Sequence, residues 1–474
     1  MKIKQICMMV LFGLGVIPAV QAQTFDKLWK EVEQAQKKSL PKTVIKLTDE
    51  IYQKGEKEKN SAQMLKAYMW RMKTQETLTP DSFYVGLKGL EQWAKQTDQP
   101  MDRAILHSLI AGIYANYAAS NQWQLRQRTE IVGETPSVDM REWTANMFVE
   151  KVRANIKEAL ADSVLLLKTS SRNYIPFIEL GETSEYYHHD MYHLLASRGI
   201  ESLNQIERLG RIGFNDTMPS PVKQDIKNIY GNMIAAYKAA SLKEGYILTA
   251  LNYLEWRRNA DRSVMLLKIK AGRRGLTEDT YLTALNTLKS KFASEPVSAE
   301  VYLAQARYAI EKEQQINALQ LCDEAIRLYP NYRRINAVKN LREEILAPSL
   351  NVRAAGQAFP NEEIKLDVFH KNLDGFTLRL YREKKLVKEQ HYSVLRPQDY
   401  RTQDTVFTFK APDLGSYVMR IVPDIRAKRD SESNFNVTRF KVLTCRLPGN
   451  QYEVVALDGQ TGHPVPNTKI TLYN

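Results

Sequence analysis

The chain has 474 residues, of which 67 are Lys or Arg and 54 are Asp or Glu, and its formal net charge is +13. The basic residues are spread among acidic ones along helical segments, a pattern typical of solvated helix faces and not of a nucleic-acid site. Three cysteines in a chain large enough to bury a core exclude a disulfide scaffold. We therefore expect no nucleic-acid partner and no fold built on disulfides.

Residues 1–22 have the pattern of a secretory signal peptide. Two lysines precede an apolar stretch from Ile6 to Ile17, and the small-residue pattern Val20-Gln21-Ala22 predicts the cleavage site. The apolar stretch is short for a bilayer span, and no later segment approaches the length of a membrane helix. We expect an exported chain, in the periplasm or cell envelope, with no integral membrane segment after signal cleavage.

Residues 23–346 show helical periodicity in nearly every stretch. The stripe that predicts the first helix recurs at intervals of four, three and four residues and consists of Phe25, Trp29, Val32 and Gln36. Pro41 ends this helix, because proline lacks the amide hydrogen that a helix interior needs. The helical region is predicted to end at Ala347-Pro348.

The segment from Ala299 to Leu346 is the clearest repeat unit. An aromatic residue, small residues and a closing proline fall where a tetratricopeptide (TPR) repeat places them, at Tyr302, Ala306, Ala318, Ala325 and Pro330. Small residues let the two helices of a hairpin approach closely, and the proline ends the second helix. We expect a capping helix from Tyr332 onward, and a TPR-like helical solenoid with degenerate earlier repeats.

From about Val352 the apolar period changes to two, which predicts strands. Turn signals separate the strands, so residues 347–444 are predicted to form an antiparallel β-sandwich of immunoglobulin type. Residues 445–474 read as two strands joined by a Gly/Pro-rich turn. Two strands cannot bury a core of their own. We therefore expect an α + β multidomain chain that ends in an incomplete second sandwich, as the front part of a longer protein.

One cluster is a candidate metal-binding or catalytic site, namely His188-His189-Asp190 with His193. On a helix, His189 and His193 would share a face, as zinc ligands can. The Glu of the zinc-protease pattern His-Glu-x-x-His is missing, and no third ligand is visible in the sequence. The alternative is a polar helix entrance packed by tyrosines, and this interpretation is preferred. We expect no metal site and no cofactor.

We found no catalytic motif in the sequence that would support an enzyme. The chain has no Gly-x-Ser-x-Gly nucleophile motif and no phosphate-binding loop of the Walker type. After signal cleavage only Cys322 and Cys445 remain. We expect both to be small buried hydrophobic residues and not a disulfide, which would need two distant segments to meet.

The segment from Asp458 to Tyr473 resembles the opening of the second macroglobulin domain in bacterial α2-macroglobulin-like proteins. The residues that carry the resemblance are Asp458, Thr461, Gly462, Pro464 and Val465. Asp413-Leu-Gly-Ser-Tyr417 resembles part of the first macroglobulin domain, and Tyr192-His-Leu-Leu-Ala-Ser-Arg198 resembles a helix of the preceding region. The order of parts is similar to that of Bacteroidetes-type members of the family.

The resemblance implies an exported endopeptidase inhibitor that traps a protease after cleavage of a bait segment, often with a Cys-Gly-Glu-Gln thioester. Neither Cys322 nor Cys445 is followed by Gly-Glu-Gln, so no thioester forms in this chain. We expect an N-terminal part of such an inhibitor, without trapping machinery, whose helical region binds proteases or envelope proteins. The alternatives are a stand-alone exported protein-binding module and, ranked last, a hydrolase centred on the histidine cluster.

Overall fold

The computed structural model describes residues 16–128, 139–207, 209, 220–270, 280–425, 430–449, 451–469 and 471. Contacts divide the chain into two compact units, Met1–Gly275 and Leu276–Asn474. Helices come first and antiparallel and mixed sheets follow, which confirms the predicted α + β arrangement. Residues 1–15 of the predicted signal peptide lie outside the described residues.

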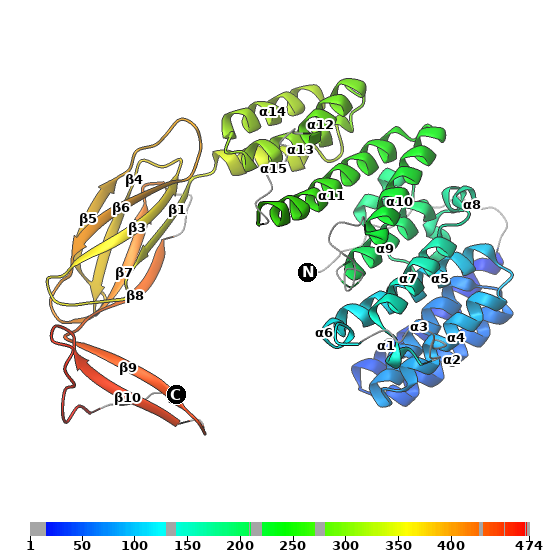
Figure 1. Ribbon diagram of the computed structural model, residues 1–474, viewed down its shortest axis with the longest axis horizontal. Coiled ribbons are helices and arrows are strands. Elements are labelled where there is room, and N and C mark those ends of the chain that lie inside the picture. Colours follow the sequence, from blue (N-terminus) through cyan, green and yellow to red (C-terminus); the bar gives the residue numbers. More distant parts are fainter. Residues whose placement is uncertain are drawn as a thin grey trace. The chain divides into compact units, whose positions relative to one another are not determined.

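The described part of the first unit is helical (Figure 1). Its α-helices are α1 (Val16–Lys37), α2 (Pro41–Lys57), α3 (Ser61–Leu78), α4 (Ser82–Gln96), α5 (Pro100–Ser120), α6 (Gln122–Leu125), α7 (Ala145–Ala159), α8 (Ser163–Lys168), α9 (Met191–Ile206), α10 (Pro221–Ala239) and α11 (Lys243–Lys270). Short 3-10 helices are η1 (Met140–Glu142), η2 (Ser171–Tyr174) and η3 (Glu182–Tyr187). None of the helices described is long and apolar enough to cross a bilayer.

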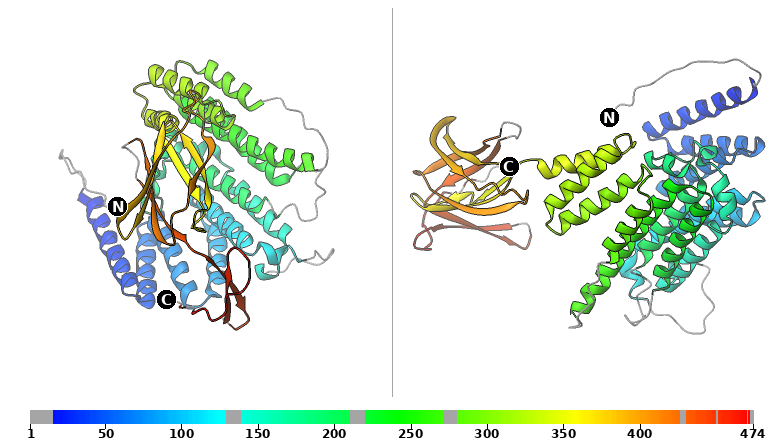
Figure 2. Two further views of the ribbon diagram at one scale, coloured as in Figure 1. Left: turned by 90° about the vertical axis from the view of Figure 1, so that its left-hand side faces the viewer. Right: turned by 90° about the horizontal axis from the view of Figure 1, so that it is seen from above.

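The helices of this unit lie side by side, as Figures 1 and 2 both show. The predicted apolar stripe of the first helix is buried at Phe25, Trp29 and Val32, and the buried face continues through Ala35 and not through the predicted Gln36. Proline occupies the first turn of α2, α5 and α10, where its missing amide hydrogen costs nothing.

The second unit begins with helices and continues into strands. The helices are α12 (Thr280–Lys291), α13 (Ser298–Glu311), α14 (Gln315–Leu328) and α15 (Ile335–Leu346). The strands are β1 (Ser349–Ala354), β2 (Gln357–Ala358), β3 (Glu363–Lys371), β4 (Gly375–Arg382), β5 (Lys385–Ser393), β6 (Gln403–Lys410), β7 (Gly415–Pro423), β8 (Ser431–Val437), β9 (Phe440–Leu447) and β10 (Gln451–Asp458).

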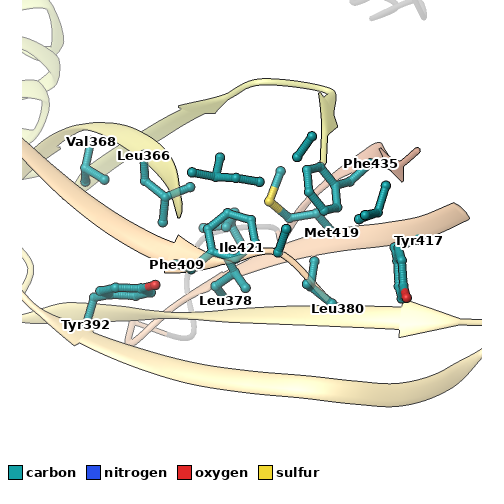
Figure 3. Packing of buried hydrophobic residues seen from close by; sticks show 14 of the residues in the cluster. Leu366, Val368, Leu378, Leu380, Tyr392, Phe409, Tyr417, Met419, Ile421 and Phe435 are labelled. Atoms are coloured by element: carbon teal, nitrogen blue, oxygen red, sulfur yellow. The ribbon is translucent and has the colours of Figure 1, made fainter. Parts of the chain in front are cut away.

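Strands β1 to β8 form two sheets, in the orders β1-β3-β6 and β2-β8-β7-β4-β5. Alternate residues of each strand point inward, so that Leu366 and Val368 of one sheet meet Leu378 and Ile421 of the other in a single apolar core (Figure 3). All pairings are antiparallel except the short β2–β8 pair. The immunoglobulin-like identity of this sandwich stays a prediction.

Strands β9 and β10 form a separate two-stranded antiparallel sheet. β9 runs across the expected boundary between residues 444 and 445, and its register pairs Phe440 with Asp458 and Leu447 with Gln451. The first sandwich therefore ends with β8 at Val437, before the turn at Thr438. The physical reason is that β9 forms its β-ladder with β10 and with neither sheet of the sandwich.

Candidate binding groove in the helical unit

The histidine cluster lies at the entrance of α9. His188 and His189 have positive φ angles of 53° and 55° and precede the helix, which begins after the N-cap Asp190. Only His193 is helical, so the premise that His189 and His193 share a helix face is wrong. Among the described residues, no group of three or more His, Cys, Asp or Glu side chains is arranged to hold a metal ion.

Both ring nitrogens of His189 are occupied by neighbouring side chains. Arg172 Nη2 lies 2.8 Å from Nε2, and Ser184 Oγ lies 3.0 Å from Nδ1. A guanidinium only donates, so Nε2 accepts and Nδ1 carries the hydrogen. Ser184 Oγ accepts that hydrogen and donates its own to the Gly181 carbonyl at 2.7 Å. Both ring nitrogens of His189 therefore make hydrogen bonds that stabilise the loop before α9.

Asp190 is a buried carboxylate held by neutral donors. It accepts from the His193 amide at 2.6 Å and from the Tyr237 hydroxyl at 3.2 Å. Burial raises the pKa of Asp190 to about 6, against the opposing effect of these hydrogen bonds. The His193 ring stacks on Tyr187 with centroids 3.5 Å apart, and burial lowers the pKa of His193 to about 4. The arrangement is that of a capped and packed helix entrance.

A groove of about 690 Å³ lies between α7, α9 and α10. Its lining residues are Glu150, Arg153, Ala154, Ile156, Lys157, Leu160, Ala161, Tyr192, Leu203, Asp225, Asn228, Ile229 and Asn232. Along α7 and α10 they recur at intervals of three and four residues, which places them on one face of each helix. The groove thus has an apolar floor and polar helix faces beside it.

Arg153 connects the two outer helices of the groove. Its guanidinium donates to Asp225 on α10 at 3.4 Å through Nη2, with a second and shorter bond through Nε, and to Glu150 on α7 at 2.8 Å. The hydrogen bond to Asp225 raises the pKa of Arg153. Arg153 therefore bonds one carboxylate on each of the two helices, and the three charged side chains line this part of the groove.

Three other polar groups that line the groove make no hydrogen bond or ion pair with any residue that the structure describes. These groups are the Lys157 ammonium, the Asn232 amide and the Tyr192 hydroxyl. The Asn228 amide oxygen accepts from Gln224 at 2.8 Å, which leaves its NH₂ group uncommitted. Tyr192 is only 3% exposed, and burial followed by the charge of Asp190 raises its pKa to about 12.

The sequence did not predict this groove. The signal that could have found it is the spacing of Asp225, Asn228 and Asn232 by three and four residues, which places three short polar side chains on one face of a helix. The pairing of Arg153 with Asp225, 72 positions away, could not be read from local pattern.

In the second unit, four of the predicted repeat-packing residues are buried. Tyr302 is 3% exposed, and Ala306, Ala318 and Ala325 are fully buried. Pro330 is exposed and follows Tyr329, the C-cap of α14. Tyr302 also donates to Glu324 of α14 at 3.0 Å. α15 follows the α13–α14 hairpin, in the segment where the capping helix was predicted.

The residues that carry the family resemblance form one turn after β10. Asp458 Oδ1 accepts from the amides of Gln460 and Thr461 at 3.1 and 2.9 Å and from the Thr461 hydroxyl at 2.9 Å. Gly462 has a φ of +72°, and Val465 N donates to the Ala456 carbonyl at 2.9 Å. Pro464 bridges back to Leu457.

The two cysteines of the predicted mature chain differ. Cys322 is fully buried in α14, and burial raises the pKa of its thiol to about 11. Cys445 is exposed, so the expectation that it is buried was wrong. The reason is that β9 is exposed along its whole length. Both thiols are free in this structure.

Comparisons with known proteins identify no family for this chain. A scan against protein-family models found no match, and a search of curated proteins found none either. Solved structures are matched, among them the CARDB domain of a Pyrococcus furiosus protein in complex with di-metal ions. That domain is 13% identical, and the alignment covers 19% of this chain and 92% of the other, with a TM-score of 0.15. So weak a similarity indicates neither a family nor a function.

Proposed function

We propose that the chain is the N-terminal part of an exported α2-macroglobulin-like protease inhibitor, and that its helical region is a protein-interaction platform. The proposal assigns no catalytic residue, cofactor or thioester to this chain. The observation that carries it is the turn from Asp458 to Val465, which follows a β-sandwich and a hairpin in the order that the resemblance implies.

The conformation of that turn supports the proposal because each motif residue has a structural role within it. Asp458 organises the turn, Gly462 supplies the positive φ, and Pro464 with Val465 returns the chain to β10. Asp, Gly and Pro suit turns for such local reasons, because Asp bonds nearby backbone amides, Gly adopts a positive φ and Pro fixes its own φ. The motif is therefore a structural signature, and its residues need take no part in protease binding.

The helical region supports the interaction role through the groove. Its 690 Å³ exceed what one or two side chains fill, and uncommitted donors line it. This observation also favours the second candidate, a stand-alone exported protein-binding module, because the groove is formed entirely within the helical unit. The two candidates share the interaction role and differ in whether protease trapping accompanies it.

The inhibitor proposal is tested on the native protein. An antibody raised against this chain should detect, in envelope fractions of the source organism, a polypeptide well above 54.6 kDa. On addition of trypsin, that antigen should enter a complex that cleaves a small chromogenic substrate and no longer cleaves a large protein substrate.

An antigen that stays free after trypsin addition would overturn the inhibitor proposal. An antigen of the chain's own mass that binds envelope proteins would instead favour the stand-alone module. A chymotrypsin-like protease serves as the parallel measurement, because trapping depends on cleavage of a bait and not on one protease specificity.

A further inference from the structure

We infer that the contact between α15 and the sandwich is acid-sensitive, and that His370 is the group whose protonation weakens it. In this contact Asn372 and Lys371 donate to main-chain carbonyls at the end of α15, those of Ile345 and Glu344. A buried imidazole with an unpaired ring nitrogen lies next to these two residues in the chain, at the end of β3. Such a response is a property of the fold and does not depend on the proposed inhibitor role.

His370 lies in the core of the sandwich, close to the point where the chain enters from α15. Leu366, Val368 and His370 alternate along β3 and are all buried, so the imidazole continues the inner face of the strand. Its register partner on β1 is Leu350, which follows shortly after Leu346 ends α15. A change in how the imidazole packs therefore acts on the strand that leaves the helix.

The Nδ1 atom of His370 is the observation that points to a response to acid. The residue is 1% exposed, and its Nε2 lies 3.3 Å from Thr405 Oγ1. Nδ1 has no hydrogen-bond partner among the residues that the structure describes. A neutral imidazole can leave one nitrogen as an unused acceptor, whereas an imidazolium has a hydrogen on both nitrogens. Protonation therefore puts a charge and an unsatisfied N–H group into the core, and both are costly there.

The sheet that contains His370 places no carboxylate against the imidazole. The neighbouring charged residues are Asp367 and Lys371 on β3, Arg353 on β1 and Asp404 on β6. Alternation along the strands puts all four on the outer face of the sheet, opposite to the imidazole. None of these four groups therefore compensates a positive charge on the ring.

The other segments at this end of the core do not compensate it either. Glu343 and Glu344 of α15 are exposed. Asp374 and Asp399, in the loops before β4 and β6, each pair with an exposed arginine. Across the core, the Tyr392 hydroxyl of β5 donates to a main-chain carbonyl of β6 at 3.0 Å. The imidazolium would thus be buried without a counter-charge.

Acid favours the open form of the contact. Burial lowers the pKa of His370 below its usual value of 6.5, so the closed form prefers the neutral ring. The stability that the neutral ring contributes is complete above pH 6.5 and is lost as the pH falls through the lowered pKa. When the contact opens, the imidazole is hydrated again and recovers its usual pKa, so a proton binds the open form more tightly.

Hydrogen exchange of the full mature chain, measured by mass spectrometry at pH 7.5 and 5.5 and corrected for intrinsic rates, tests the inference. Both pH values lie above the usual pKa values of Asp and Glu, about 3.9 and 4.3, so the carboxylates stay charged. We expect exchange in residues 345–352 and 366–374 to be about three- to tenfold faster at pH 5.5, because uptake of one proton permits at most about tenfold. Residues 301–309 of α13 and 416–422 of β7 are internal references that should show no such change.

Two variants assign the response to His370. His370→Gln retains a donor for Thr405, His370→Phe retains a planar ring, and neither side chain titrates in this interval. In both variants, corrected exchange of residues 345–352 should differ by less than about twofold between the two pH values, whatever their overall stability. His391→Gln is the matched control and should retain the full response, because His391 is an exposed histidine of the same sandwich that bonds Asp424 at 3.0 Å.

Equal corrected exchange at the two pH values in the unaltered chain would overturn the inference. A response that persists in both His370 variants, or that is lost in His391→Gln, would overturn it as well. So would a response of equal size in the α13 and β7 references, because that would be a global loss of stability and not a weakened contact. None of these results bears on the inhibitor proposal, which the protease-complex assay tests separately.

Discussion

The side-chain amide of Asn372 donates to the main-chain carbonyl of Ile345 at 2.9 Å, so the turn after β3 caps the end of α15. The same amide reaches the Leu346 carbonyl at 2.9 Å, and the Lys371 ammonium donates to the Glu344 carbonyl at 2.7 Å. The last carbonyls of a helix have no partner within it. These contacts therefore join the helical hairpin to the sandwich within the second unit.

Replacing Asn372 should weaken the contact between α15 and the sandwich and lower the free energy of unfolding. Asn372 is buried and has a φ of 54°, so Asn372→Ala removes the amide and also strains the backbone. We expect a loss of about 1–3 kcal/mol in the free energy of unfolding, measured by urea denaturation of the full chain. Asn372→Gly is the matched control, because it loses the amide but tolerates the positive φ. Equal stability of all three chains would contradict the proposed cap.

Local patterns of the sequence were sufficient for much of the fold. The alternation of Ile364, Leu366 and Val368 predicts a half-buried strand, and these residues are buried in β3. Pro41 marks the first residue of α2 because its effect is local. The features that were not predicted depend on distant partners. β8 and β9 are close in sequence, but β8 pairs with β7 of the sandwich and β9 pairs with β10.

The histidine cluster and the groove also depend on features that a local sequence pattern does not contain. Histidines spaced by four residues suggested a shared helix face, but whether a helix includes both depends on where it begins. The carboxylate of Asp190 caps the helix and fixes its start after His189. The groove was missed because its walls come from three helices, and Arg153 and Asp225 meet only in the folded chain.

Asp190 and His193 should give opposing pH dependences of stability. Burial raises the pKa of Asp190 to about 6 from 3.8, so its contribution to stability is complete below pH 3.8 and is lost as the pH rises through 6. Burial lowers the pKa of His193 to about 4 from 6.5, so its contribution is complete above pH 6.5 and is lost as the pH falls through 4. The two slopes oppose each other between about pH 4 and 6.

Single variants separate these slopes. Asp190→Asn keeps an N-capping side chain and should leave a stability that falls as the pH is lowered from 6.5 to 4. His193→Phe keeps a ring to stack on Tyr187 and should leave a stability that rises over the same interval. Each slope is at most about 1.4 kcal/mol per pH unit. Urea denaturation at several pH values measures both, and unchanged profiles in both variants would refute the assignment.

Close packing of α13 on α14 should make Ala318 intolerant of a larger side chain. Ala318 is fully buried, and Ala318→Leu adds atoms for which the hairpin has no room. We expect a loss of about 1–3 kcal/mol of stability. Gln320→Leu, at an exposed position of the same helix, is the control and should change stability by about 0.5 kcal/mol or less. Similar losses in the two variants would argue against tight helix packing at Ala318.

The two free thiols should react at very different rates. Cys445 is exposed, whereas Cys322 is fully buried and has a pKa raised to about 11 by burial. An accessible thiolate attacks a disulfide reagent and displaces one of its two thiols, so the native mature chain should show one fast-reacting thiol and the denatured chain two. Cys445→Ser should abolish the fast reaction and leave the slow one. Two fast thiols in the native chain would be inconsistent with the burial of Cys322.

The turn after β10 should depend on the acceptor of Asp458 and not on its charge. Three donors from Gln460 and Thr461 converge on one carboxylate oxygen, and these bonds hold the pKa of Asp458 below its usual value. An asparagine oxygen accepts the same bonds, so Asp458→Asn should preserve slow amide exchange at Thr461, whereas Asp458→Ala should accelerate it about tenfold. Hydrogen exchange followed by NMR measures both. Fast exchange in the asparagine variant would show that the charge is essential, and the motif would then need a role beyond the geometry of a turn.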